Sequence, residues 1–411
     1  MTGRWRQAGS TRFEKDEMAK HKILIAGAGL GGLAAASCLM KAGHDVEVYE
    51  QAPALGEVGA GIQVSANAMH VLRHLGLGPT IEKAGVKPGA YVFRLYNTGE
   101  VIQEFPLAAR HEAQHGAPYT QMHRADFHEM LAAKTRELKP EVIHLDHRIV
   151  DFTENENGVE LHFANGRSAK GDLLIGADGL KSVVRRQIAG EAPATYTGDA
   201  AWRVTIPVER LPGNFLDKVM SVFIGGGGHA VCYYVRGGKL LNFVGIVETD
   251  DVQEESWTVK MPWEQLKADF KEFHPIIQRV LDEAEHDQCF RWSLFYRPPI
   301  KNWSTARATL LGDSAHATLP YLAQGAVMAI EDGMVLTRAL GMRDNIADAL
   351  QLYQRNRIER TARIVNQSTD NRRLFHLRTE AEIRSEFAKR NEGEDRAQWL
   401  YSYNPLTVEL V

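Results

Sequence analysis

The chain has 411 residues, of which 44% are hydrophobic, and a formal net charge of -4. That length and hydrophobic content allow a large buried core and two closely packed domains. The small negative charge, with no long basic run, excludes the electrostatic footprint of a nucleic-acid-binding protein. No segment approaches the roughly 20 apolar residues that span a bilayer, so no membrane partner is expected.

The N-terminal segment and the cysteines indicate the cellular compartment of the protein. Met1–Lys20 carries scattered charge and no apolar stretch of the about 7–15 residues that a secretory signal needs, so it is interpreted as an N-terminal extension, with Met18 as an alternative start. The cysteines, Cys38, Cys232 and Cys289, are far apart and lack metal-ligand spacing. We therefore expect a cytoplasmic protein without a metal site.

The first folded segment is expected to be a βαβ unit. A buried strand over Lys22–Ala26 leads into a glycine turn over Gly27–Gly32. A small-residue helix follows over Leu33–Ala42, and a second strand over Asp45–Tyr49 ends at Glu50.

Helical and strand patterns then follow one another. The expected elements are a glycine-rich loop over 56–61, helices over 67–75 and 124–137, strands over 142–150 and 158–164, and a buried strand over 172–176. Asn165-Gly166 marks a hairpin turn after the second of these strands.

From residue 201 to 247 the pattern changes to alternating strands, which indicates an antiparallel sheet in a separate layer. A buried strand over 308–311 and a helix over 325–340 follow, and the remainder is charged and helical. The expected fold class is therefore α/β: a Rossmann-like domain with an interleaved antiparallel sheet domain and C-terminal helices. The expected division is a dinucleotide domain over 21–195 and 290–370, a sheet domain over 196–289 and a helical tail over 371–411.

The glycine turn indicates a bound dinucleotide. Gly27, Gly29 and Gly32 form a GxGxxG pattern between a strand and a helix, which permits a tight turn and close approach of a pyrophosphate to the helix N-terminus. Glu50 stands where an acid accepts hydrogen bonds from a ribose, and its charge would repel a 2′-phosphate. FAD and NAD both fit this pattern.

Two further motifs favour FAD. Gly176-Ala177-Asp178-Gly179 follows one buried strand, and Gly312-Asp313-Ser314-Ala315-His316 follows another. Either aspartate alone could simply cap a helix. Together with the glycine turn, the set resembles the FAD-dependent aromatic hydroxylases of the para-hydroxybenzoate hydroxylase family, over about residues 20–340.

The resemblance implies roles for particular residues. Asp313 would contact the ribityl chain, Gly325–Val327 the flavin pyrimidine edge, Arg124 the flavin and Val150 the adenine. The whole cofactor set implied by motif and resemblance is Gly27, Gly29, Leu30, Gly32, Glu50, Gln51, Arg124, Val150, Asp178, Asp313, Gly325, Ala326 and Val327. NADH or NADPH would bind transiently to reduce the flavin, which supplies the oxygen chemistry.

Within that family the sequence is most similar to salicylate, 3-hydroxybenzoate and 6-hydroxynicotinate hydroxylases. Three phrases carry this likeness: Gly59-Ala60-Gly61-Ile62-Gln63, His229-x-x-x-Tyr233, and Leu319-Pro320-Tyr321 continuing to Asp332. The implied substrate is a small hydroxylated aromatic or pyridine carboxylate, with dioxygen as co-substrate. The sequence leaves open whether decarboxylation accompanies hydroxylation.

His229 and Tyr233 are the expected catalytic residues. An ordinary histidine pKa near 6.5 suits transfer of a phenolic proton, and a spacing of four puts both side chains on one face of a strand. The alternative is that both merely pack the sheet. The expected substrate-binding residues are Gln63, Tyr321, Pro320 and Met220.

Other readings remain. Arg203, Arg291 and Tyr296 are weaker candidates for meeting an anionic substrate, and surface solvation is favoured for them. The alternatives are a 3-hydroxybenzoate 6-hydroxylase-type reaction without decarboxylation, a flavin reductase, and a non-catalytic flavin-binding protein. A homodimer is considered as the assembly, which the sequence leaves open.

Overall fold

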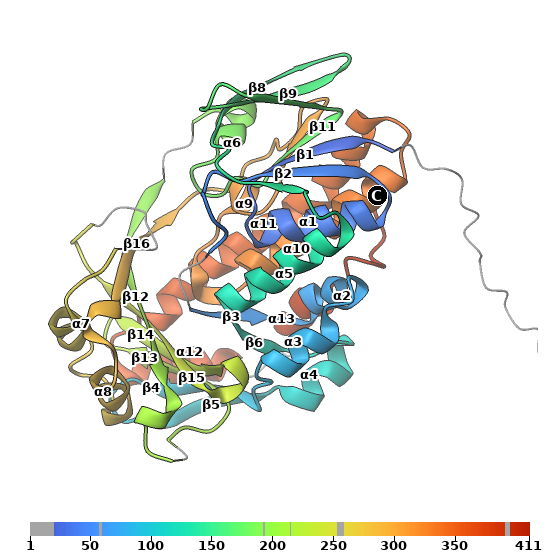
Figure 1. The fold of residues 1–411 in the computed structure, drawn as a ribbon. Coiled ribbons are helices and arrows are strands. Elements are labelled where there is room, and N and C mark those ends of the chain that lie inside the picture. The colour runs from blue at the N-terminus through green and yellow to red at the C-terminus, as the bar shows by residue number, and fades with distance from the viewer. Residues whose placement is uncertain (1–19, 57–59, 192–193, 214, 253–258, 391–394) are drawn as a thin grey trace, which may run out of the picture.

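The protein is described by a computed structural model that combines a parallel sheet and a larger, mostly antiparallel sheet (Figure 1). The residues described are 20–56, 60–191, 194–213, 215–252, 259–390 and 395–411. The proposed extension before residue 20 and Gly59 of the glycine-rich loop lie outside this part of the chain.

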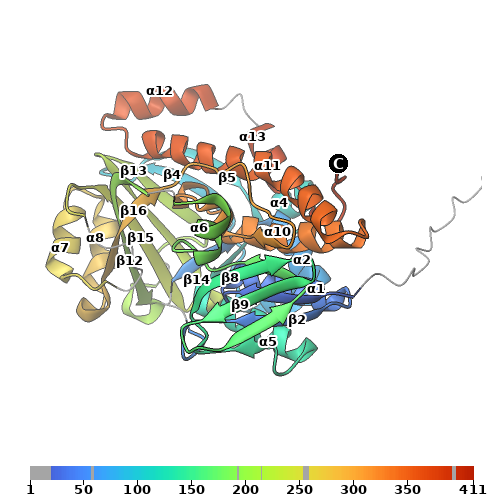
Figure 2. The same ribbon diagram turned by 90° about the horizontal axis from the view of Figure 1, so that it is seen from above.

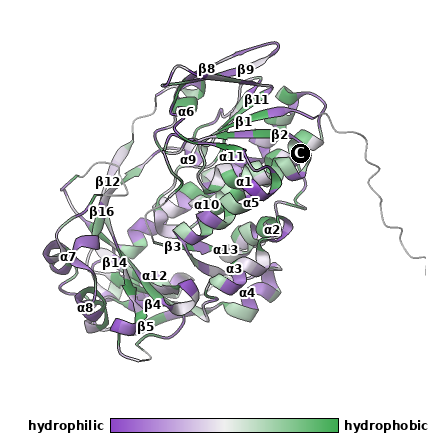
Figure 3. Ribbon diagram, in the orientation of Figure 1, coloured by the Kyte–Doolittle hydropathy of each residue, from purple (hydrophilic) through white to green (hydrophobic). Residues whose placement is uncertain are grey.

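Five parallel strands form the first sheet. In spatial order they are β17 (Ala308–Leu310), β11 (Leu173–Gly176), β1 (Lys22–Ala26), β2 (Asp45–Tyr49) and β7 (Ile143–His144). Their apolar residues are buried because helices cover the sheet, and much of β1 and β11 is green, hydrophobic, in Figure 3. The expected strands over 22–26 and 45–49 are confirmed.

The expected strand over 142–150 is wrong as a single element. Its start forms β7 in the parallel sheet, whereas β8 (Ile149–Asn155) belongs to a three-stranded antiparallel sheet with β9 (Gly158–Phe163) and β10 (Ser168–Gly171). Gly166 lies in the predicted hairpin turn with a φ of 78°, a left-handed conformation that glycine adopts without strain.

Helices cover the parallel sheet. The first, α1 (Leu30–Lys41), begins three residues earlier than expected and contacts both α5 (Arg124–Leu138) and α10 (Gly325–Gly341). A Cβ on Gly333 would lie 2.8 Å from the Cα of Ala35, so α1 and α10 approach at backbone distance. Small residues in α1 make this close packing possible.

The second sheet has seven strands. In spatial order they are β16 (Phe290–Tyr296), β12 (Thr195–Pro207), β15 (Leu240–Glu248), β14 (Gly228–Val235), β13 (Met220–Gly225), β4 (Ala90–Leu95) and β5 (Val101–Pro106). The separate antiparallel layer is confirmed, except that β13 and β4 pair in parallel. We call the face that carries Tyr233 the inner face and the face covered by α7 (Trp263–Asp269) and α8 (Pro275–Asp282) the outer face.

The expected domain limits need correction at this sheet. β4 and β5 come from the segment assigned to the dinucleotide domain, and β16 begins after residue 289, yet all three are strands of the seven-stranded sheet. Pairing between strands more than 100 residues apart is decided by packing of the whole chain and leaves no local signal.

The remaining elements complete the fold. They are β3 (Gly61–Val64), β6 (Thr120–His123), α2 (Ala66–His74), α3 (Gly78–Ala84), α4 (Ala108–His115), α6 (Val183–Ala189), α9 (Asp313–His316), α11 (Ile346–Phe375), α12 (Glu380–Arg390), α13 (Asp395–Tyr401), and the 3₁₀ helices η1 (Val208–Arg210), η2 (Arg236–Gly238), η3 (His286–Gln288) and η4 (Pro320–Leu322). The long α11 runs from the parallel-sheet side to the seven-stranded sheet, with α12 beyond it (Figure 2). The limit expected at residue 370 therefore falls within a continuous helix.

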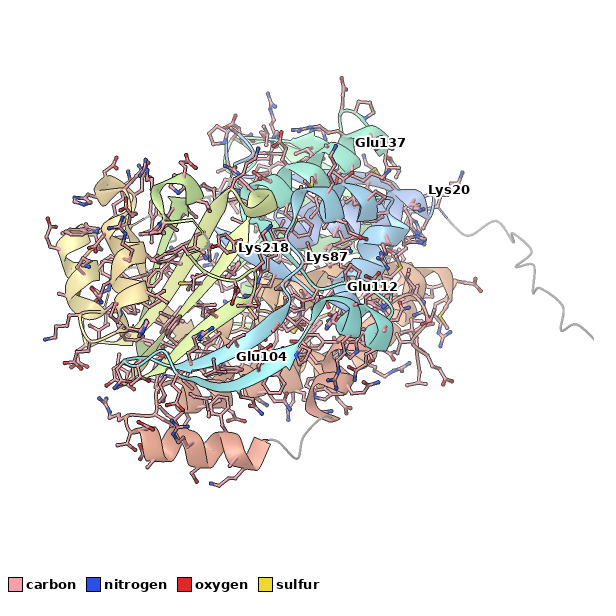
Figure 4. All side chains as sticks on the ribbon, turned by 90° about the horizontal axis from the view of Figure 1, so that it is seen from below. Lys20, Lys87, Glu104, Glu112, Glu137 and Lys218 are labelled. Carbon is pink, nitrogen blue, oxygen red and sulfur yellow. The ribbon has the colours of Figure 1, made fainter. Side chains whose placement is uncertain are left out.

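Charged side chains lie on the surface of these layers. Lys87, just after α3, and Glu112 of α4 lie close together in Figure 4, with Nζ and Oε2 3.8 Å apart. None of the helices in the described ranges combines the length and apolar character that crossing a bilayer requires.

Candidate active site

Three turns meet at one edge of the parallel sheet. β1, β11 and β17 are neighbours, and Ala26 pairs with Gly176, which pairs with Leu310. The turns that follow these residues contain the glycine motif, Asp178 and Asp313. Ligands of open α/β sheets bind outside the carboxyl ends of the strands, so the geometry joins the three motifs into one candidate site.

The glycine turn has two tightly packed positions and one open position. A Cβ on Gly27 would lie 2.4 Å from the carbonyl oxygen of Ala177, and a Cβ on Gly32 would lie 2.1 Å from that of Gly27. A Cβ on Gly29 would meet no protein atom within 4 Å. Gly29 precedes α1, whose first turn has no side-chain cap and no acidic residue. Uncapped N–H groups beside an open position fit the pyrophosphate of a dinucleotide.

Glu50 stabilises this turn through two hydrogen bonds with backbone N–H groups. Its Oε2 accepts a hydrogen bond from the Ala28 N–H at 2.9 Å, and its Oε1 accepts one from the Ala52 N–H at 2.9 Å. A carboxylate has about four acceptor positions, so capacity for a ribose remains. Of the adjacent expected residues, Gln51 is exposed and Leu30 is buried in the core.

Asp178 caps a helix, the simpler role that the sequence left open. Its carboxylate accepts hydrogen bonds from the Ser182 hydroxyl, from the Val183 N–H at 2.7 Å and from the Val184 N–H at 3.2 Å. Burial raises the pKa of Asp178, although these hydrogen bonds act in the opposite direction. The bonds fix the turn beside Gly27, and a direct contact of Asp178 with the cofactor stays a prediction.

Asp313 lies on the open side of the same edge. Its side chain is exposed, whereas the next three residues of α9 are buried. A Cβ on Gly325 would lie 3.9 Å from Oδ1 of Asp313, so the third motif meets the start of α10. The first residues of α10, Gly325 to Val327, have no side-chain cap on their N–H groups. The structure thus places Asp313 beside the start of α10, and the expected contacts with the ribityl chain and the pyrimidine edge stay predictions.

Beneath this pair lies a buried ionic network that sequence reasoning missed. Asp332 of α10 lies 2.6 Å from Nε2 of His316, accepts the Gly312 N–H at 3.0 Å and accepts Nε of Arg357 at 2.7 Å. Burial acts to raise the pKa of Asp332, but the His316 and Arg357 charges outweigh it and hold the pKa below its ordinary value. The available signal was an acidic pair, Glu331-Asp332, inside a helix whose only other polar residues are Thr337 and Arg338.

The acid beside it is held in the same way. Glu331 pairs with Arg360 at 2.7 Å and with Arg357 at 2.7 Å, and it accepts a hydrogen bond from Asn67 of α2 at 2.5 Å. Burial opposes ionisation of Glu331, yet the two arginines lower its pKa overall. The network ties α2, α9, α10 and α11 together directly behind the third motif.

Two further expected cofactor residues lie on α5 and β8. Arg124 begins α5, and its N–H donates to the Ala60 carbonyl at 2.6 Å. Val150 lies on β8 with 41% of its surface exposed. Their contacts with FAD stay predictions.

His229 and Tyr233 project from the same face of β14. The His229 ring packs against Tyr321 at 5.4 Å, Phe375 at 4.9 Å and His376 at 5.5 Å between ring centroids. His229 is almost completely buried, and burial together with the nearby His376 holds its pKa well below the ordinary value. The imidazole is therefore neutral near pH 7, with an unprotonated ring nitrogen that can accept a hydrogen bond, although burial makes it a weaker base.

Tyr233 faces the glycine-rich strand β3. A Cβ on Gly61 would lie 2.4 Å from the Tyr233 hydroxyl oxygen, so only glycine permits this approach. Gln63 hydrogen-bonds the Tyr233 hydroxyl and also accepts the Tyr119 hydroxyl at 2.6 Å. Burial raises the pKa of Tyr233, although Arg203 and Gln63 act to lower it. The structure thus brings Gln63 and Tyr233 together, as expected for one site.

Tyr321 has a partner that the sequence did not suggest. Its hydroxyl donates to Oδ2 of Asp199 at 2.7 Å, and Arg372 of α11 binds the same carboxylate at 2.6 and 2.8 Å. The Tyr321 hydroxyl is thus bound by Asp199, and a contact of Tyr321 with a substrate stays a prediction. The other two expected substrate residues are Pro320, which is exposed, and Met220, which is buried on the inner face.

The two arginines considered for an anionic substrate lie on opposite faces of the seven-stranded sheet. Surface solvation is wrong for Arg291, which is 1% exposed and pairs with Asp251 at 2.9 Å on the outer face. Arg203 is half-buried on the inner face, with its guanidinium 4.7 Å from the ring centroid of Trp292. Tyr296, at the end of β16, is also half-buried.

The chain is similar to known proteins over nearly its whole length. The FAD binding domain family matches residues 20–368. The chain is 36% identical over 395 residues to 3-hydroxybenzoate 6-hydroxylase of Polaromonas naphthalenivorans, covering 95% of this chain and 98% of that protein. It is 32% identical over 400 residues to 6-hydroxynicotinate 3-monooxygenase of Bordetella bronchiseptica, with 95% and 97% covered. The solved structure of Klebsiella pneumoniae HpxO with FAD and uric acid has a TM-score of 0.81 at 26% identity, with 97% and 99% covered.

Proposed function

This chain belongs to the family of FAD-dependent aromatic hydroxylases, and we propose that its substrate is a small hydroxylated aromatic or pyridine carboxylate. One oxygen atom of dioxygen is transferred to the ring, with NADH or NADPH as the transient electron donor. The observation that carries the proposal is the meeting of the glycine turn, Asp178 and Asp313 at one sheet edge, beside the uncapped start of α10.

The residues present fit FAD. The open position at Gly29 suits the pyrophosphate, and the exposed carboxylate of Asp313 beside Gly325 suits a hydroxylated chain that ends at the first turn of α10. When bound, reduced FAD activates dioxygen for transfer to an electron-rich ring. The protein supplies position, a dry environment and control of protons.

His229 and Tyr233 are proposed as the proton-handling residues. A neutral, buried imidazole can accept a hydrogen bond from a ring hydroxyl, and a shift of that proton toward the imidazole raises the electron density of the ring carbons. Tyr233 has a pKa raised by burial, so its hydroxyl stays protonated and can donate a hydrogen bond to an oxygen of the substrate.

The relatives name two related substrate classes, a hydroxybenzoate and a hydroxynicotinate. Replacement of the carboxyl group by a hydroxyl, with release of carbon dioxide, is proposed for a substrate whose ring hydroxyl is ortho or para to the carboxylate. A 3-hydroxybenzoate-type substrate would instead keep its carboxylate.

A substrate screen tests the proposal. Purified protein, reconstituted with FAD, is given NADH or NADPH with 3-hydroxybenzoate, salicylate and 6-hydroxynicotinate in turn, and nicotinamide oxidation and product mass are followed. We expect one acid to accelerate oxidation and to yield a product that has gained one oxygen atom or exchanged its carboxyl for a hydroxyl. Nicotinamide oxidation that yields only hydrogen peroxide would support a reductase, and FAD binding without any oxidation would support a flavin-binding protein. Light scattering on the same sample tests the homodimer.

A further inference from the structure

The inner face of the seven-stranded sheet has a strip that its neighbours leave partly open. Side chains of directly paired residues on β14, β15 and β12 lie side by side in rows across this face. The rows are His229–Ile246–Ala201, Val231–Val244–Arg203 and Tyr233–Asn242–Thr205. We call them the His229 row, the Arg203 row and the Tyr233 row.

The two outer rows are covered by other elements, except at Thr205, which is half-buried. Tyr321 of η4 and Phe375 of α11 pack on His229, and all three members of its row are at most 2% exposed. β3 covers the other side, where the Gly61 N–H donates to Oδ1 of Asn242 at 2.6 Å. His229 and Tyr233 are four residues apart, or about 13 Å along the strand.

The Arg203 row lies between these covers. Its three members, Arg203, Val244 and Val231, are all half-buried, in contrast to the fully buried His229 row. The strip therefore has an apolar floor of two valines and a cation at its β12 end. Because strands are about 4.8 Å apart, that end is about 10 Å from β14.

Arg203 is well suited to hold a carboxylate in a fixed place. It is the one Lys or Arg in the sequences of β12, β14 and β15. Its guanidinium carbon lies 4.7 Å from the centroid of the buried Trp292 ring, a cation–π contact that restricts where the planar group can lie. A guanidinium in a fixed plane can offer two parallel N–H donors to a carboxylate.

We propose that Arg203 binds the carboxylate of the aromatic substrate, with the ring over Val231 and Val244, between His229 and Tyr233. The inference rests on the proposed function and deepens it by assigning the acid group of the substrate to one end of the strip. A carboxylate held at β12 directs the ring toward β14, where a hydroxyl substituent meets His229 or Tyr233. Arg203 is thus a specificity-determining residue for acids over uncharged phenols.

The test compares binding of acids with binding of their carboxamides. The probes are 3-hydroxybenzoate, salicylate and 6-hydroxynicotinate, each with its carboxamide, titrated calorimetrically into the FAD-loaded protein. The variants are Arg203→Gln and Arg203→Lys. The matched control is Arg94→Gln, because Arg94 is also half-buried in this sheet but lies on the outer face and donates to the Gly99 carbonyl at 3.2 Å.

We expect Arg203→Gln to weaken binding of the preferred acid about 10- to 100-fold, the loss typical of a charge-assisted hydrogen bond. Binding of its carboxamide should change less than about threefold, and Arg203→Lys should give an intermediate loss for the acid. Arg94→Gln should leave both affinities unchanged. Equal weakening of acid and carboxamide, or unchanged acid binding, overturns the inference, as does a wild-type protein that binds no acid more tightly than its carboxamide.

The outcome is separable from that of the proposed function. Selective acid binding that depends on Arg203, without any oxygenated product, would contradict hydroxylation and leave the carboxylate site standing. If Arg203→Gln still forms the oxygenated product and binds the acid with unchanged affinity, hydroxylation stands and the carboxylate site is contradicted. FAD content and thermal unfolding of each variant show whether it folds, and Arg203→Lys provides the second test if Arg203→Gln does not.

Discussion

Asp332 and His316 are hydrogen-bonded at 2.6 Å in the interior, and this bond joins the third motif to the helix that starts beside it. The same carboxylate accepts the Gly312 N–H and faces Arg357. A buried charge network of this kind fixes a loop only while every member is paired, because an unpaired charge cannot be solvated there. The loop that presents Asp313 is therefore stabilised by the buried ion pairs and hydrogen bonds of Asp332.

Asp332→Asn tests this support. The substitution keeps the shape but removes the charge that faces Arg357 and His316. We expect a loss of about 3 kcal/mol in the free energy of unfolding and a weaker hold on FAD. Urea unfolding and FAD release measure both. The control is Asp370→Asn on the exposed side of α11, which should change neither; an equally stable Asp332→Asn protein would contradict the structural role.

The two buried acids of the network, Asp332 and Glu331, predict that stability depends on pH in the acidic range. The pKa values of Asp332 and Glu331 are lower in the folded protein than in the unfolded chain, so the folded state binds fewer protons. Their stabilisation is complete above their ordinary pKa, about pH 4 to 4.5, and is lost as the pH falls through the depressed values. Unfolding measured from pH 6 to pH 3 should show a shallower decline for Asp332→Asn than for the wild type, and parallel curves would exclude this contribution.

The glycine motif predicts two different losses. Gly29→Ala adds a methyl group that meets no protein atom, at a φ of -72° that alanine adopts freely, so stability without FAD should change by less than about 1 kcal/mol. FAD affinity should fall at least about 10-fold, because that open position is where the pyrophosphate approaches. Gly32→Ala meets the Gly27 carbonyl and should destabilise the protein itself by about 1–3 kcal/mol. Calorimetry with and without FAD distinguishes the two, and matching effects would refute the distinction.

His229→Gln should lower kcat about 100-fold and leave FAD binding intact, since it removes a proton acceptor without opening the cofactor site. Because burial holds the pKa of His229 well below 6.5, the wild-type pH profile should show no loss of activity from its protonation between pH 6 and 8. Stopped-flow rates across this range check both statements. His286→Gln, an exposed histidine of η3, is the control. An undiminished rate would remove His229 from the mechanism.

Tyr321→Phe removes the hydroxyl that donates to Asp199 and keeps the ring. We expect a loss of about 1–2 kcal/mol in stability, because Asp199 retains Arg372. Substrate affinity should stay within about twofold, because the hydroxyl is already bound by Asp199. A large loss of affinity with unchanged stability, measured by titration and thermal unfolding, would instead assign the hydroxyl to substrate binding.

The sequence by itself determined the cofactor half of this protein. The strand, turn and helix around Gly27, Gly29 and Gly32, and the buried strands before Asp178 and Asp313, are short segments whose apolar runs and glycine spacing are local properties. Even the common face of His229 and Tyr233 follows from the two-residue period of a strand.

Only the tertiary structure decided which partners these residues have. Asp178 caps a helix, Tyr321 binds an aspartate 122 residues away, and Asp332 pairs with Arg357 on another helix. The inner-face position of Arg203 depends on strand register, in which a shift of one residue would move it to the outer face. Such contacts join segments far apart in the chain, and packing of the whole molecule selects them. The local sequence pattern therefore cannot predict them.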